Sequence, residues 1–288
     1  GHGHRPGGVA ADGPGDAGLS VQRIYDPVAR TLRLAPNLRP GQQAFQIATQ
    51  IAILEQDNLL RTIVDKGAFT SDESRGLARI GLANYFAGAL ILPYATFLEA
   101  AERKRYDIEL LGHQFGVGFE TVCHRLSTLQ RHNARGVPYF FIRVDRAGNI
   151  SKRQSATDFH FSRVGGTCPL WNVYEAFANP GRILTQLARM PDDRTYLWIA
   201  RTVSHGRGGY GAPTKTFAIA LGCDVRYADR VVYGQGLNID PSLATPIGMG
   251  CKVCERSGCP QRAFPPIGRD LNVDETRSYF EPYATSSS

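Results

Sequence analysis

The strongest chemical signal in this 288-residue sequence is a group of three cysteines near its C-terminal end. Cys251, Cys254 and Cys259 fall within nine residues, and Pro260 follows the last of them. Two residues between the first two thiols let both face one metal from a single turn, and the glycine before the third lets the chain bend back. Three thiolates leave one coordination position open. We expect Cys223, at the end of a predicted strand, to be the fourth ligand.

The metal on these thiols is either zinc or an iron–sulfur cluster. Zinc sites favour two close pairs of Cys, or of Cys and His. Here three ligands are clustered, one is distant and a proline follows the last, which is typical of ferredoxin-like clusters. A cubane cluster also needs its ligands spread more widely than one zinc ion does. The sequence therefore favours a [4Fe–4S] cluster, with zinc as the alternative.

The remaining cysteines, Cys123 and Cys168, give weaker signals. Cys123 lies on the apolar face of a predicted helix, where a core position is expected. Cys168 precedes Pro169 in a loop and could line a pocket, but a solitary Cys-Pro pair carries little information. Six cysteines in 288 residues are too few for a secreted disulfide scaffold. We therefore expect reduced thiols and a cytoplasmic location.

A glycine-rich segment between two predicted strands is the second candidate site. Four glycines within residues 206–211 would let the backbone approach a ligand closely. Arg207 and Lys215 supply charge for a phosphate, and Tyr210 could stack on a base. Arg201 lies on the preceding strand and could point the same way. No helix follows directly, so the segment is not a P-loop or a dinucleotide fingerprint. It predicts either contact with a nucleotide-like anion or an exposed hairpin.

The composition is that of a folded protein with room for an anionic partner. Hydrophobic residues make up 42% of the chain and charged residues 20%, which excludes a disordered protein. At roughly 150 residues per domain, the length predicts about two domains. The net charge of +7 suits a phosphate-bearing ligand or nucleic acid. No apolar run approaches the ~20 residues of a membrane-spanning helix, so we expect no membrane contact.

The helical and strand patterns divide the sequence near residue 137. Residues 1–20 are rich in glycine and predict a flexible head or linker. Residues 21–137 have helical periodicity, with helices expected at 41–65, 71–92, 94–104, 107–115 and 119–130. Residues 138–288 predict a hairpin at 139–154, strands at 182–190, 195–204 and 214–221, and a turn-rich C-terminal part. The expected fold class is α+β, with a helical first half and an antiparallel sheet in the second.

Residues 107–130 have the rhythm of a DNA-reading helix–turn–helix. A recognition helix needs polar and basic residues at its start. Phe119, Glu120 and Thr121 are poor material for contacting bases. We therefore expect a packed helical hairpin here, with DNA reading as the alternative.

Several segments resemble a known family of regulators. Residues 83–93, which read ANYFAGALILP, and Phe115-Gly116-Val117 resemble the domain shared by bacterial regulators and metallopeptidases of the ImmA/IrrE type. Residues 216–223 and 251–266 resemble the C-terminal region of short-chain fatty acyl-CoA-responsive regulators of the XRE family. The similarity covers residues 40–285, and its C-terminal motif is long and specific.

The resemblance implies a one-component transcription activator of propionate and short-chain fatty acid metabolism. This part of it would bind an acyl-CoA, here propionyl-CoA, and would carry a [4Fe–4S] cluster on the four predicted cysteine ligands. Promoter DNA would be bound by an N-terminal domain upstream of this chain, and a homodimer is expected by analogy. The alternatives are a zinc-stapled DNA-binding protein and a protein that processes CoA thioesters.

One departure from the peptidase relatives concerns catalysis. In those proteins the first helix carries His-Glu-x-x-His, whose two histidines hold zinc from one helix face. Thr49, Gln50 and Ile53 occupy the places of His, Glu and the second His. None of these side chains can serve that chemistry. We therefore expect a degenerate zincin that keeps the fold as a binding shell and is not an enzyme.

Overall fold

A computed structural model describes residues 21–155, 168–206, 210–211, 214–278, 283 and 285. The chain divides into two compact units, Gly1–Ile91 and Leu92–Ser288. The sequence-predicted division near residue 137 thus lies inside the second unit. The reason is that the last helix before residue 137 packs on the sheet that follows it, as the ring contact between His124 and Phe141 shows.

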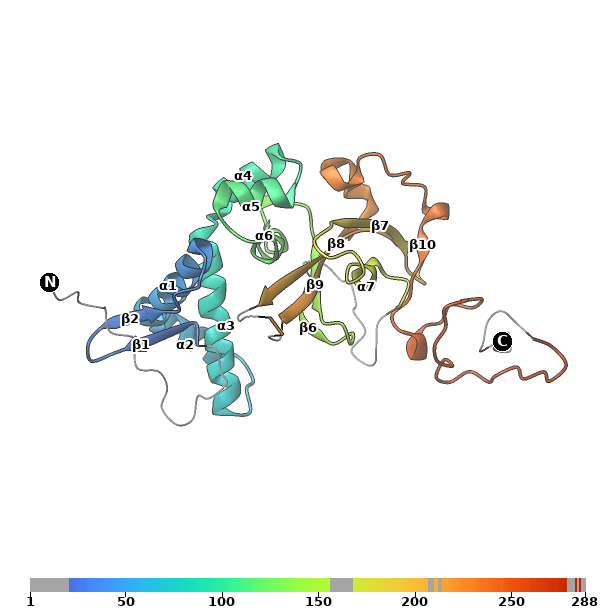
Figure 1. Ribbon diagram of the computed structural model, residues 1–288, viewed down its shortest axis with the longest axis horizontal. Helices are drawn as coiled ribbons and strands as arrows, with labels where there is room; N and C mark the ends of the chain where they lie inside the picture. Colours follow the sequence, from blue (N-terminus) through green and yellow to red (C-terminus); the bar gives the residue numbers. More distant parts are fainter. Residues whose placement is uncertain are drawn as a thin grey trace. The chain divides into compact units, whose positions relative to one another are not determined.

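The first unit contains a β-hairpin and three helices (Figure 1). The strands are β1 (Arg23–Asp26) and β2 (Thr31–Leu34), and the helices are α1 (Pro40–Glu55), α2 (Asp57–Asp65) and α3 (Asp72–Ile91). The single helix expected over 41–65 is broken at Gln56, whose φ of −115° and ψ of 19° end α1. Ala52, Leu60 and Ala83 form a buried cluster, and the two alanines let α1 and α3 pack closely.

Three helices open the second unit: α4 (Tyr94–Arg103), α5 (Ile108–Phe115) and α6 (Phe119–Leu126). Asp107 caps α5 by accepting a hydrogen bond from the Leu110 N–H at 2.9 Å. Gly116 ends that helix with a left-handed φ of 66°. Arg125 of α6 is 4% exposed and donates to the Leu92 carbonyl oxygen at 2.9 Å. The predicted packed helical hairpin is confirmed. Its Arg125 is buried and bonded within the protein, so it does not face solvent.

Among the described helices, none is by itself long and apolar enough to cross a membrane; α3 and α4 pass that test only when they are taken together as a bent pair.

A six-stranded sheet forms the body of the second unit, in the order β10-β7-β8-β9-β5-β6 (Figure 1). Its strands are β5 (Phe140–Val144), β6 (Ile150–Ser155), β7 (Leu184–Arg189), β8 (Thr195–Gly206), β9 (Thr214–Asp224) and β10 (Thr245–Pro246). All neighbours are antiparallel except β10, which runs parallel to β7. A small separate hairpin pairs β3 (Gln130–Arg131) with β4 (Ala134–Arg135). The expected hairpin, three strands and α+β class are confirmed.

Successive side chains of a strand point to opposite faces of the sheet. Both faces are covered in this unit, each by different elements. On one side, Phe140 shares a core with Trp198 and with Trp171, which precedes the short helix α7 (Asn172–Glu175). The two indole rings lie 4.6 Å apart between centroids. On the other side, the ring of Phe141 meets His124 of α6, with 5.5 Å between centroids.

The chain after β9 is built from turns and 3₁₀ helices, as its composition predicts. These helices are η1 (Val225–Arg230), η2 (Val232–Gly234), η3 (Pro241–Leu243) and η4 (Cys251–Val253). Among residues 251–278, only Arg262 and Pro266 are buried. This segment therefore gains little stability from apolar burial, which scales with the area removed from water.

We predict that Gly222→Ala destabilises the sheet. A Cβ at Gly222 would lie 2.6 Å from the ring of Trp198, which is fully buried and has no room to move. Overpacking of this kind is expected to lower the free energy of unfolding by ~1–3 kcal/mol. Urea unfolding followed by far-UV circular dichroism measures it.

The matched control is Gly81→Ala, on an exposed part of α3 where an added Cβ meets nothing within 4 Å. This change should raise stability by roughly 0.5–1 kcal/mol, because alanine is the better helix former. Equal stability of the two variants would show that Trp198 does not require glycine at position 222.

A candidate cysteine metal centre

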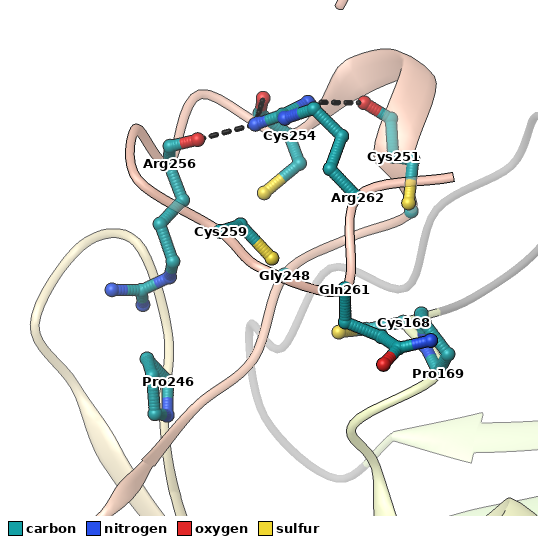
Figure 2. Close-up of a pocket in the computed structure, with 11 residues that line it drawn as sticks. Cys168, Pro169, Pro246, Gly248, Cys251, Cys254, Arg256, Cys259, Gln261 and Arg262 are labelled. Atoms are coloured by element: carbon teal, nitrogen blue, oxygen red, sulfur yellow. Dashed lines mark hydrogen bonds between the residues drawn. The ribbon is translucent and has the colours of Figure 1, made fainter. Parts of the chain in front are cut away.

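Four thiols line one pocket of the second unit. The lining residues are Cys168, Pro169, Pro246, Gly248, Gly250, Cys251, Cys254, Arg256, Cys259, Gln261 and Arg262. Figure 2 shows that Cys168 enters from the loop before α7, whereas the other three thiols come from the segment after β10. The empty space of about 310 Å³ includes the open mouth of the pocket. The site therefore joins two segments that are far apart in the sequence.

Cys168 is held by the core beneath the pocket. It is 8% exposed, and the main-chain N–H groups of Gly248 and Leu170 lie near enough to its thiol to influence the pKa. Gln186 of β7 fixes the adjoining turn, because its amide donates to the Leu170 carbonyl at 2.8 Å and accepts from the Asn172 N–H at 2.9 Å. Burial raises the pKa of the Cys168 thiol, and the two N–H donors act in the opposite direction. Such donors suit a metal-bound thiolate.

Glycines shape the segment that carries the other three thiols. Gly250 before η4 has a φ of 122°, and Gly258 before Cys259 has a φ of 66°. Both values lie in the left-handed region that favours glycine. At Gly248, a Cβ would collide with the sulfur of Cys254. Only glycine at these positions lets the chain turn and lets the thiol reach the pocket.

Cys223, the predicted fourth ligand, lies elsewhere. It is fully buried in β9 opposite Leu197 of β8 and is not among the residues that line the pocket. Burial raises the pKa of its thiol, which keeps the thiol protonated. Cys168 lines the pocket beside the three clustered thiols, as the sequence allowed. It shares with Cys259 a proline at the next position.

The four thiols of the pocket are ligands of the kind that both zinc and iron–sulfur clusters take. Among the described residues, no group of three His, Cys, Asp or Glu side chains is arranged to hold a single metal ion. The pocket thus brings together the right ligand chemistry without the closed geometry of a one-ion site.

The predicted anion-binding residues do not gather in one site. Arg201 of β8 pairs with Glu109 at 2.9 Å and lies over the ring of Phe119, 5.2 Å from its centroid. Lys215 of β9 lies over the ring of Phe217 at 5.3 Å. Arg201 is therefore held by an ion pair and a ring, Lys215 is exposed and contacts a ring, and neither cation lines the cysteine pocket.

The register of β8 and β9 explains this separation. Lys215 pairs with His205 and Arg201 pairs with Ile219, so the two cations share a face but stand four residues apart along the strands, about 13 Å. Tyr210 is fully exposed in the turn between the strands, and Arg207 lies outside the described residues. Of the two predictions for this segment, contact with an anion or an exposed hairpin, the hairpin agrees with its described residues.

The α1 residues at the positions of the peptidase zinc motif serve packing. Thr49 is fully buried, and its hydroxyl donates to the Phe45 carbonyl oxygen at 2.8 Å. Gln50 is 8% exposed, and Ile53 packs against the buried cluster of the first unit. In this structure these side chains contribute to a protein core.

Two family models divide the chain between them. Residues 14–127 match the IrrE N-terminal-like domain, and residues 128–283 match the C-terminal domain of the short-chain fatty acyl coenzyme A regulators. The boundary between the two matches lies near the sequence-predicted division at residue 137. The second match contains the whole sheet and all four thiols of the pocket.

The chain is similar to named regulators over 93% of its length. It is 59% identical to the HTH-type transcriptional regulator RamB and 57% identical to PrpR, both of Mycobacterium tuberculosis, covering 57% and 55% of them. It is 49% identical to the propionyl-CoA carboxylase regulator of Cereibacter sphaeroides, covering 59% of it. The chain thus spans little more than half the length of these relatives. A solved Mycobacterium tuberculosis transcriptional regulator matches with a TM-score of 0.90 and 57% identity, over 92% of this chain and 81% of the other.

We predict that the six thiols differ sharply in reactivity in the reduced, metal-free protein. Cys251, Cys254 and Cys259 are partly exposed, whereas Cys123 and Cys223 are fully buried. Burial raises the pKa of both buried thiols, so the reactive thiolate is scarce at them near neutral pH. Mass spectrometry after a short iodoacetamide pulse should find the three C-terminal cysteines alkylated and the two buried ones unmodified. Labelling in guanidinium, where all six should react, is the control; rapid native labelling of Cys223 would contradict its placement.

Proposed function

Since the chain belongs to the short-chain fatty acyl coenzyme A regulator family, we propose that it is the effector-sensing part of a transcriptional regulator of propionate and short-chain fatty acid metabolism. The observation that carries this proposal is the match of residues 128–283, which contain the sheet and the pocket with its four thiols. Two of the relatives are named as HTH-type transcriptional regulators. DNA would be read by a part of the protein outside this chain, and two copies would be needed to read two half-sites.

The cysteine pocket is proposed to hold a [4Fe–4S] cluster on Cys168, Cys251, Cys254 and Cys259. The support for a cluster over zinc is the cysteine pattern, in which three thiols are clustered, one is distant and a proline follows the last. When bound, such a cluster supplies a redox-sensitive cross-link between the segments that ligate it. Cys168 would be the anchor of that link, because the core and Gln186 fix its position.

The proposed link gives the pocket a sensory role. Cys168 belongs to the buried core, whereas residues 251–278 bury only two side chains. Because metal binding to such a segment contributes directly to its folding free energy, loss of the cluster would release the segment from the sheet. A signal that attacks the cluster would thus change the surface of the second unit.

An acyl-CoA is the proposed effector, with propionyl-CoA as the first compound to test. The support is the family description and the cations on one face of β8 and β9. Of these, Lys215 is exposed and free to approach a phosphate, whereas Arg201 already pairs with Glu109. We further propose that the chain is not a peptidase, because Thr49, Gln50 and Ile53 cannot bind zinc and lie in packed positions.

Anaerobic purification tests the cluster and its ligands together. The wild-type chain should be brown and contain about four iron and four sulfide. Cys168→Ser should lose most of the iron, because it removes the anchoring ligand. Cys223→Ser is the matched control and should keep its iron, because that thiol lies away from the pocket. If the Cys223 variant loses its iron and the Cys168 variant keeps it, Cys223 is the fourth ligand, as the sequence predicted. If the chain is colourless and contains one zinc ion, the site is a structural zinc site.

Isothermal titration tests the effector. Propionyl-CoA should bind the purified chain more tightly than free CoA does, because the acyl group adds apolar contact. Lys215→Ala should weaken binding by up to about fivefold, the effect of one exposed ion pair of ~1 kcal/mol. Lys66→Ala, an exposed lysine in the first unit, serves as the control and should bind normally. If wild type and Lys215→Ala bind propionyl-CoA with equal affinity, the face of β8 and β9 that carries Lys215 is not part of the effector site.

A further inference from the structure

Arg262 is the buried charge of an otherwise exposed segment. It is 5% exposed, and within 251–278 only Pro266 shares that degree of burial. Its guanidinium donates to the main-chain carbonyl oxygens of Cys251, at 3.1 Å, Cys254, at 3.5 Å, and Arg256. Figure 2 shows this group lying across the turn that presents the thiols. One side chain therefore ties the start of the three-cysteine loop to its middle.

Arginine is suited to this task by its geometry. A planar guanidinium offers five N–H donors in a fixed fork, whereas an ammonium group is a compact point charge on a flexible stem. Buried main-chain carbonyls are costly when they lack donors, and a buried guanidinium is costly when its donors go unused. In this loop the guanidinium supplies donors to the carbonyl oxygens, and the carbonyl oxygens supply acceptors to the guanidinium. The bonds require no metal, so they shape the loop in the metal-free chain as well.

A second arginine ties the same loop to the sheet. Arg256 lines the pocket and donates to the carbonyl oxygens of Arg189, at 2.9 Å, and Ile247, at 3.2 Å. Arg189 ends β7, and the Ile247 N–H donates to its carbonyl at 3.0 Å. The loop thus has an internal clamp at Arg262 and an external tie at Arg256.

The two arginines also match the charge of a thiolate-bound metal. Four thiolates around a dication, whether zinc or an oxidised cubane core, leave a formal charge of minus two. Arg256 and Arg262 bring a formal charge of plus two to the wall of the same pocket.

We propose that Arg262 is a positioning residue, which preshapes the three-cysteine loop through its carbonyl bonds and offsets the charge of the metal centre. The preshaping part concerns the metal-free chain, and only the charge part rests on the proposed function. Because it acts through main-chain carbonyls, Arg262 does not itself ligate the metal.

The test compares Arg262→Gln, which removes the fork and the charge, with Arg262→Lys, which keeps only the charge. Arg269→Gln, an exposed arginine of the same segment, is the matched control. The first readout is amide hydrogen exchange over residues 251–262 in the reduced, metal-free chain. We expect both Arg262 variants to exchange at least about tenfold faster than wild type, and the control to exchange as wild type does.

The second readout is the rate at which a chelator removes iron or zinc from the loaded chain. Residues that orient metal ligands typically contribute 10–100-fold to metal affinity, so Arg262→Gln should lose its metal faster by about that factor. Arg262→Lys should fall between Arg262→Gln and wild type, because it keeps the charge. Tryptophan fluorescence verifies that the sheet is folded, and if Arg262→Gln fails that check, Arg262→Lys decides both readouts.

The outcomes separate this inference from the proposed function. If wild type binds no metal but the Arg262 variants exchange faster, the proposed cluster is wrong and the clamp stands. If wild type binds metal and the Arg262 variants match it in exchange and in metal release, the clamp is wrong and the cluster stands.

Discussion

The packing of Trp198 on Gly222 fixes the centre of the sheet. The position of the cysteine pocket depends on that contact through the residues packed on Trp198. The two residues face each other across β8 and β9, and no side chain larger than a hydrogen fits at position 222. The indole of Trp198 supports that of Trp171, three residues after Cys168. The first thiol of the pocket is therefore held by a close-packed apolar core, in which displacement of one group is felt by its neighbours.

The other three thiols depend on a different set of forces. Their segment has almost no core of its own, so its shape comes from left-handed glycines and from the carbonyl bonds of Arg262. Polar bonds of this kind fix geometry well but add little net stability, because water competes for the same groups. Under the proposed function, the metal centre joins Cys168, which a packed core holds, to a C-terminal segment that has almost no core. That asymmetry is what would let the state of the metal control the C-terminal segment.

The helical first unit buries two polar side chains of α1. Thr49 and Gln50, which the sequence places at the positions of the peptidase zinc motif, are both buried in the unit. The Thr49 hydroxyl satisfies its hydrogen-bonding need on its own helix, so the polar side chain can be buried at low cost. Function in this family thus has to be argued from the sites, because the fold alone does not specify it.

The sequence by itself determined the local features of this protein. The spacing of Cys251, Cys254 and Cys259 was enough to mark the segment that lines the pocket, and apolar patterning was enough to locate the packed helical hairpin, the β5–β6 hairpin and strands β7, β8 and β9. Motif resemblance was enough to identify the family. These features depend on residues close together in the chain, so composition and spacing carry them.

Only the tertiary structure decided which cysteine completes the pocket and where the compact units divide. Whether Cys223 faces a pocket or a core depends on strand register, and a shift of one residue reverses the side that every side chain faces. Cys168 meets the C-terminal thiols because β10 pairs with β7 and brings its segment beside the loop before α7. The helices before residue 137 belong with the sheet because α6 packs on it. Such long-range pairings leave no trace in local periodicity, since they are set by the packing of the whole unit.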